Sequence, residues 1–153
     1  MTLDEILLLW ANSDSIKREC LDIIAECNTA LKTLYGTIKS SGAAEKLGTS
    51  GGKTTTLDLA VLRAMEEKEK YSRIAQQAND RLQTTLYFSQ IVSRVVDENA
   101  RAFEADIFRE KIRTGLSWSQ ISASRKRSSR TCRRVYARLC QAVEKELKSQ
   151  DLI

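Results

Sequence analysis

Proline and histidine are absent from this 153-residue sequence, and glycine occurs only six times. Proline and glycine build the turns and edges of β-proteins, so their scarcity argues against an all-β fold. The absence of histidine excludes Ser-His and Cys-His nucleophile pairs and zinc sites that mix Cys with His. The sequence therefore predicts an all-α protein without imidazole chemistry.

Long apolar runs are absent too. The longest, Ile6 to Ala11, is far shorter than the roughly 20 residues that span a bilayer, and no basic segment or small-residue cleavage site surrounds it. We therefore expect a cytoplasmic protein. Within this run, Trp10 either packs inside the protein or contributes to a dimer surface.

Cysteine is present but shows no metal-binding spacing. The four cysteines form no C-x-x-C pair and recur at separations of seven and eight, which place each pair on one face of a helix. They are Cys20, Cys27, Cys132 and Cys140. Reduced core cysteine is predicted over metal or disulfide chemistry, with no metal site and no cofactor.

Charge is distributed unevenly along the chain. The net charge is +5, but residues 1–100 contain 12 basic and 14 acidic side chains, whereas residues 101–153 contain 13 basic and 6 acidic ones. The positive excess in the last third predicts an anionic partner for that part.

The first two thirds of the chain predict two long helices. Thr2 and Glu5 form a T-x-x-E capping box, and the polar stretch from Asn12 to Ser15 interrupts or restarts the first helix. From Cys20 to Ile38 the apolar positions alternate at spacings of four and three, as in helices that pack side by side. Leu57 to Val96 repeats this spacing with smaller and partly polar residues, including Lys68.

Residues 40–56 contain four of the six glycines and predict a flexible loop, with Thr56 as the cap of the following helix. We expect residues 1–97 to form an antiparallel helical hairpin, coiled-coil-like, that oligomerises. A second copy completing a four-helix bundle is the simplest partner. Gly48 to Thr54 resembles a phosphate-binding loop but has three residues between its glycines instead of four, so a linker is the better interpretation.

Residues 100–148 predict a helix-turn-helix domain. One helix ends at Gly115, and Ser117 with Gln120 forms an S-x-x-Q capping box for a short helix. Arg125, Lys126 and Arg127 form the turn, and Ser128 or Ser129 caps a last helix. That helix points Cys132, Val135, Tyr136, Leu139 and Val143 inward.

This domain has the chemistry of a duplex-DNA reader. Between residues 125 and 138 there are seven basic residues and no acidic one. The second helix of such a motif enters the major groove, where arginine suits guanine and hydroxyls suit phosphates. We expect phosphate contacts from Arg125, Lys126, Arg127 and Arg138, base contacts from Arg130, Arg133 and Arg134, and supporting contacts from Ser128, Ser129 and Thr131.

The same stretch resembles a known family. Gly115 to Ser122, Ser128 to Tyr136 and Val143 to Leu147 are similar to the fourth region of bacterial sigma factors, above all to the version in phage-encoded transcription regulators of the RinA and ArpU type. The resemblance implies a sequence-specific transcription regulator, encoded by a phage or prophage and acting in the bacterial host cell.

Residue roles implied by the resemblance agree with the spacing. Trp118 and Ile121 match core anchors, and Ser128 matches the cap of the recognition helix. The groove-facing positions are Arg130, Thr131, Arg133 and Arg134. Arg125 and Lys126 stand where relatives usually have a leucine and a glycine, which predicts an altered or longer turn.

Two other functions remain open. A small terminase subunit also joins a helix-turn-helix to a helical oligomerisation region, and an adaptor could dock the basic helix on an acidic partner such as RNA polymerase. Neither is an enzyme, and no catalytic residue is predicted. The paired carboxylates Glu66 with Glu67, and Glu144 with Glu146, lie beside lysines on helix faces expected to be solvated.

Overall fold

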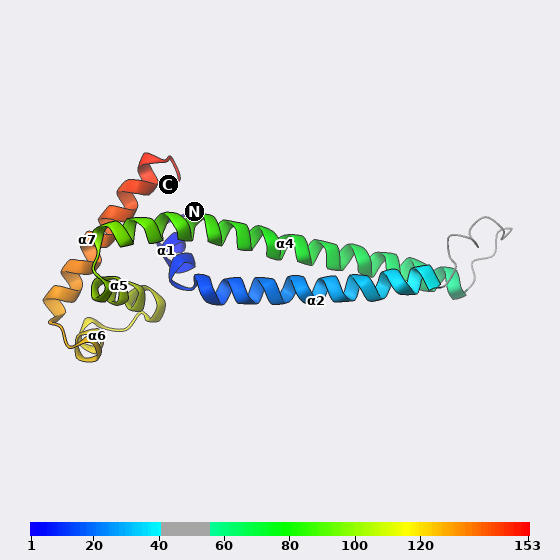
Figure 1. Cartoon of the computed structure of the whole chain (residues 1–153), viewed down its shortest axis with the longest axis horizontal. Helices are drawn as coiled ribbons and strands as arrows, with labels where there is room; N and C mark the ends of the chain where they lie inside the picture. The colour runs from blue at the N-terminus through cyan, green and yellow to red at the C-terminus, as the bar shows by residue number, and fades with distance from the viewer. Residues whose placement is uncertain (41–55) are drawn as a thin grey trace. The chain divides into compact units, whose positions relative to one another are not determined.

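The computed structural model describes residues 1–40 and 56–153, with side chains described for 1–36 and 59–153. All elements in this part of the chain are helices, as Figure 1 shows, which confirms the all-α prediction. They are α1 (Leu3–Ala11), α2 (Ser13–Ser40), α4 (Thr56–Asn99), α5 (Ala102–Thr114), α6 (Trp118–Arg125) and α7 (Ser129–Ser149). The predicted loop, except for its first and last residues, and the side-chain cap at Thr56 lie outside the described residues.

The start of the chain follows its capping chemistry. The Thr2 hydroxyl accepts the Glu5 amide at 3.3 Å, while the Glu5 carboxylate accepts the Thr2 amide at 2.7 Å. The hydrogen bond that the Glu5 carboxylate accepts from the Thr2 amide, followed by its interaction with the Thr2 side chain, lowers the pKa of Glu5. α1 ends at Ala11 and α2 begins at Ser13, so the predicted interruption of the first helix is confirmed.

The helices form two compact units, and their limits correct the predicted domain boundaries. One unit is Lys17–Leu82, and the other combines Met1–Ile16 with Gln83–Ile153. The predicted division into a hairpin of residues 1–97 and a domain of residues 100–148 therefore assigned α1 and the end of α4 to the wrong part. Heptad spacing shows which residues of a helix are buried, but not which segment buries them.

The Lys17–Leu82 unit is a pair of long helices. The α2 and α4 segments lie side by side in Figure 1, and Glu19 pairs with Arg81 at 3.4 Å. Among the side chains that the structure describes in this unit, the buried ones are the predicted seam residues Cys20, Cys27, Ala64, Ala78 and Leu82, whereas Lys68 of the same seam is exposed. Since most of these side chains are small, the described parts of the two helices bury little apolar surface against each other.

The other unit has a core assembled from segments distant in sequence. Trp10 is 2% exposed, its ring centroid lies 5.4 Å from that of Phe108, and its Nε1 donates to Ser93 Oγ at 3.0 Å. Trp10 thus packs within its own chain. The same cluster contains Ile6 and Leu7 of α1, Val92 and Val96 of α4, and Val135, Leu139, Val143 and Leu147 of α7.

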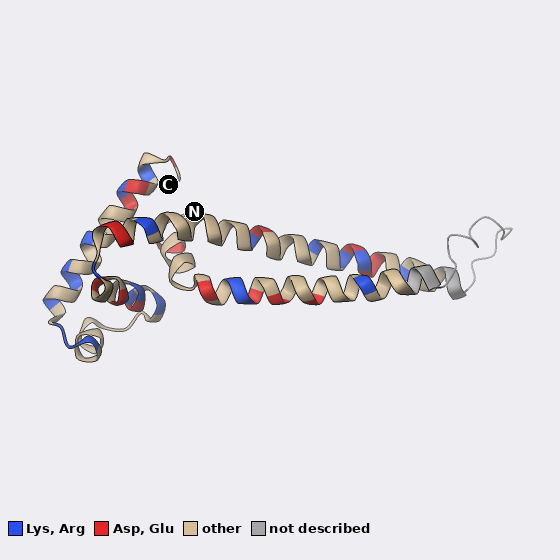
Figure 2. Ribbon diagram, in the orientation of Figure 1, with Lys and Arg blue, Asp and Glu red and all other residues tan. Residues whose placement is uncertain are grey.

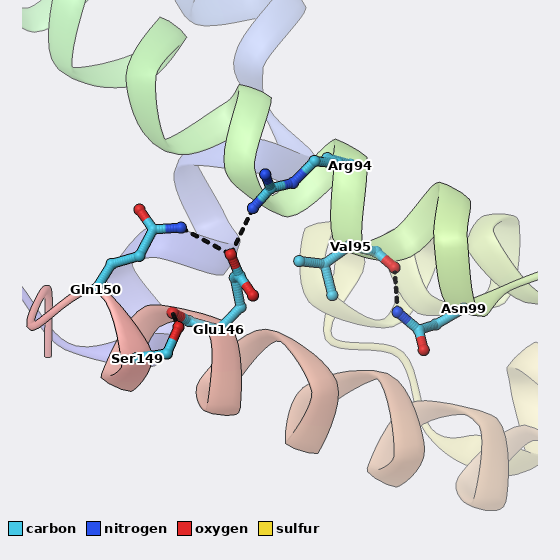
Figure 3. A network of polar contacts seen from close by, with 6 residues as sticks. All are labelled: Arg94, Val95, Asn99, Glu146, Ser149 and Gln150. Carbon is cyan, nitrogen blue, oxygen red and sulfur yellow. Dashed lines mark hydrogen bonds and ion pairs between the residues drawn. The ribbon is translucent and has the colours of Figure 1, made fainter.

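Polar contacts join the end of α4 to α7, as Figure 3 shows. Arg94 Nη2 and Gln150 Nε2 both meet Glu146 Oε1, at 2.5 and 2.7 Å. Nearby, Asn99 Nδ2 donates to the Val95 carbonyl at 2.7 Å. Glu146 was expected on a solvated helix face, so its role is corrected: it joins two helices, whereas Glu144 pairs with Lys148 of its own helix at 2.8 Å.

Candidate nucleic-acid interface

The link from α5 to α6 is built as predicted. Gly115 adopts a left-handed conformation (φ 65°), and its amide donates to the Lys111 carbonyl at 3.0 Å, which ends α5. The Ser117 amide donates to Gln120 Oε1 at 3.0 Å, and the Gln120 amide donates to Ser117 Oγ at 3.3 Å. With this reciprocal cap, only three residues, Gly115 to Ser117, separate the end of α5 from the start of α6.

The turn between α6 and α7 is short and spans Lys126 to Ser128, so Arg125, predicted to lie in the turn, is instead the last residue of α6. Lys126 adopts a left-handed conformation (φ 54°), the region that favours glycine, at a cost of roughly 1 kcal/mol. The Ser122 hydroxyl donates to the Arg127 carbonyl. Ser128 Oγ then accepts the Thr131 amide at 3.1 Å, so Ser128 and not Ser129 caps α7.

A small apolar cluster holds α5, α6 and α7 together beneath this turn. Ile107, Ile121 and Cys132 are fully buried, and Phe103, Leu116 and Trp118 pack against them. The ring of Tyr136 lies 5.5 Å from Phe108 and 5.4 Å from Trp118, and burial raises the pKa of Tyr136 to about 12. The structure thus confirms that Ile121 and Trp118 anchor the motif.

The predicted DNA-binding side chains gather on the turn and the first half of α7, where Figure 2 shows a concentration of Lys and Arg. Arg130, Thr131, Arg133, Arg134 and Arg138 are exposed, and Ser129 is partly buried. The hydroxyls of Ser128 and Thr131 lie 2.8 Å apart, so the cap occupies both of them. Arginines on successive turns of one exposed helix can reach a groove together.

Three of the predicted cations have partners within the protein. Arg125 Nε meets Glu110 Oε2 at 2.6 Å, and Arg138 Nη2 meets Glu104 Oε2 at 2.5 Å. The Arg127 guanidinium lies 4.2 Å from the centre of the Phe103 ring. Sequence reasoning missed Glu104 and Glu110 because both lie outside the acid-free stretch of residues 125–138.

The remaining predicted cations are not neutralised by an acidic side chain of the described residues. Within residues 1–36 and 59–153, no ion pair or side-chain hydrogen bond engages Lys126, Arg130, Arg133 or Arg134. By contrast, the hydrogen bond that Arg125 donates to Glu110 raises the pKa of Arg125 above its already high value.

A cleft beside α6 adds two cations that the sequence did not single out. It has a volume of about 300 Å³. It is lined by Asp106, Arg109, Glu110, Arg113, Thr114 and Arg125. Arg109 lies over the ring of Trp10 at 4.6 Å from its centre, so its guanidinium is positioned by the core. The two acids in the cleft offset most of its positive charge.

The chain matches no model of a protein family, no characterised protein and no solved structure. In the described part of the chain, no helix is long and apolar enough to span a bilayer. Nor do the described residues include a group of three or more Cys, Asp or Glu side chains arranged to hold a metal ion.

Proposed function

We propose that this protein binds duplex DNA through α6 and α7 and acts by binding, not by catalysis. The supporting observation is a set of exposed arginines, Arg130, Arg133 and Arg134, that have no ion-pair partner among the described residues. They lie on the first turns of a capped helix that follows a short turn. In helix-turn-helix proteins, side chains at these positions reach base edges in the major groove. Lys126 and Arg127, one turn earlier, suit the phosphates at the edge of that groove.

Sequence preference follows from the chemistry of arginine. The guanidinium group offers parallel N–H donors in a fixed planar geometry that match the two acceptors of guanine in the major groove. The supporting cluster around Ile121 and Cys132 fixes the helix that presents these arginines. We therefore propose specific recognition that includes guanine. From the sequence resemblance, the corresponding role is transcription regulation in a phage or prophage.

The salt dependence of binding tests the proposal. We expect the chain to bind a mixed-sequence duplex with an affinity that falls steeply between about 50 and 200 mM salt, because each phosphate contact releases condensed counterions. Selection from a random DNA pool should then enrich one sequence. Fluorescence anisotropy measures the affinity at each salt concentration, and sequencing of the bound pool identifies the enriched DNA sequence. Binding of RNA polymerase without affinity for duplex DNA would favour the adaptor instead.

Self-association is the second part of the proposal. Leu59, Leu62 and Met65 of α4 are 48%, 53% and 52% exposed at successive spacings of three, so they form an apolar strip on one helix. Because every copy has this strip, two copies can cover it isologously. A dimer also has two α7 helices, one for each of two half-sites.

Mass in solution tests the role of this strip. We expect the full-length chain to be a dimer by light scattering and the Leu62→Glu/Met65→Glu variant to be a monomer, because a buried carboxylate is costly. Ser72→Glu, at an exposed position further along α4, is the matched control and should leave the mass unchanged. A monomeric wild type contradicts the proposal, and a ring of many copies indicates a terminase subunit.

A further inference from the structure

Two carboxylates of α5 form ion pairs with the two arginines, Arg125 and Arg138, at either end of the basic stretch of residues 125–138. Glu104 contacts Arg138 at 2.5 Å, and Glu110 contacts Arg125 at 2.6 Å. The carboxylate side chains are only 13% and 16% exposed, whereas their arginines are 51% and 40% exposed. The acids are therefore mostly shielded from water, and each depends on its arginine for charge compensation.

This arrangement resists competition from DNA. If Arg138 or Arg125 turned toward a phosphate, a shielded carboxylate would lose its counter-charge, which is strongly unfavourable. If the arginine stayed in place, a phosphate approaching it would also meet the nearby negative charge. Each ion pair therefore has almost no net charge to attract a phosphate. Lys126, Arg130 and Arg134 are not paired with an acid among the described residues, so their positive charges still attract phosphates.

Building on the DNA-binding function, we propose that Glu104 and Glu110 limit sequence-independent binding by neutralising Arg138 and Arg125. Attraction to phosphates is the same for every DNA sequence, whereas contacts to base edges distinguish sequences. Neutralising two charges at the border of the interface weakens the attraction to phosphates. Arg130, Arg133 and Arg134 remain available for contacts to base edges. Both acids are then specificity-determining residues, because they increase the contrast between specific and other sites.

Glu104→Gln releases Arg138 with little disturbance of the fold. Glu104 Oε1 accepts the Arg101 amide at 3.0 Å, and Oε2 holds Arg138. Glutamine keeps one oxygen for the Arg101 amide and places its NH₂ group against the guanidinium. Glu110→Gln acts in the same way on Arg125 and tests the second pair independently. Thermal denaturation of each variant checks that it folds.

The experiment measures binding of the full-length chain to a mixed-sequence duplex across a salt series. For each released arginine we expect the slope of log affinity against log salt to steepen by about 0.9, so that the decrease in affinity between 50 and 200 mM grows about 3- to 4-fold. Affinity at low salt should rise as well. Glu98→Gln is the matched control, since it removes one exposed carboxylate that forms no ion pair within the described residues.

A double-variant cycle shows whether the effect depends on the arginine. In an Arg138→Gln background, Glu104→Gln should no longer steepen the slope. If the wild type binds DNA but both glutamine variants match Glu98→Gln, this inference is wrong while the DNA-binding function stands. A shallower slope also overturns it, because the acids would then orient the arginines onto phosphates. A wild type without affinity for duplex DNA refutes the proposed function itself.

Discussion

A chain that begins at Ser13 should lose the folded helix-turn-helix. Its missing α1 supplies Ile6, Leu7 and Trp10, all buried against α4, α5 and α7. Each such side chain contributes about 1.5–3 kcal/mol through burial. Because an entire domain has a free energy of unfolding of only about 5–15 kcal/mol, their removal takes away much of the stability of this unit. Near-ultraviolet circular dichroism around Trp118 and amide dispersion in NMR spectra would report the unfolding.

Single substitutions make the same expectation quantitative. Trp10→Ala should lower the free energy of unfolding by about 3–5 kcal/mol in urea titrations, because it opens a cavity beside Phe108 and leaves the Ser93 hydroxyl without its donor. Leu8→Ala is the matched control: Leu8 lies on the same helix but is 53% exposed, so its truncation should cost less than about 0.5 kcal/mol. Equal effects of the two substitutions would contradict a core built on α1.

Replacing Arg130 and Arg134 with alanine should relax the choice of DNA sequence. Both arginines are exposed on consecutive turns of α7 and have no ion-pair partner among the described residues. For every base that is no longer read, discrimination between sequences should fall by about 1–3 kcal/mol, and the salt dependence should become shallower as two charges disappear. Competition between a selected site and mixed-sequence DNA measures the first effect.

The control for this double variant lies on the hairpin. Arg63→Ala/Arg73→Ala removes the same net charge from exposed positions of α4 in the other unit, so it separates net charge from position. It should leave sequence choice intact. If the Arg130→Ala/Arg134→Ala protein still selects the same site with the same discrimination, these residues do not contact bases.

Local chemistry was predictable because its partners lie within a few residues. The caps at Thr2 and Ser117 and the left-handed Gly115 each depend on one helical turn, and the structure confirms all three, while the spacing left Ser128 and Ser129 open and the structure selects Ser128. The conformation of Lys126 was harder to foresee, because a lysine seldom takes a left-handed φ unless its surroundings impose it.

Long-range partners were not predictable from spacing. The apolar face of α1 could equally have met a second copy, and only the folded chain shows Trp10 against Phe108. The ion pairs of Glu104 and Glu110 were not predicted for a related reason. The net charge of residues 125–138 does not show which acidic side chains of a neighbouring helix lie beside them in the fold. The base-reading roles of the arginines stay a prediction.

The two-segment construction of the helix-turn-helix unit has a consequence for its synthesis. Trp10 and Phe108 meet across about a hundred residues, which a ribosome adds in roughly 5–20 s at its usual rates. During that interval the apolar side of α1 has no partner from α5 or α7, since neither has been made. Folding of this unit is therefore delayed until translation of α7, and the apolar side of α1 meanwhile stays exposed in the way that makes nascent chains prone to aggregation.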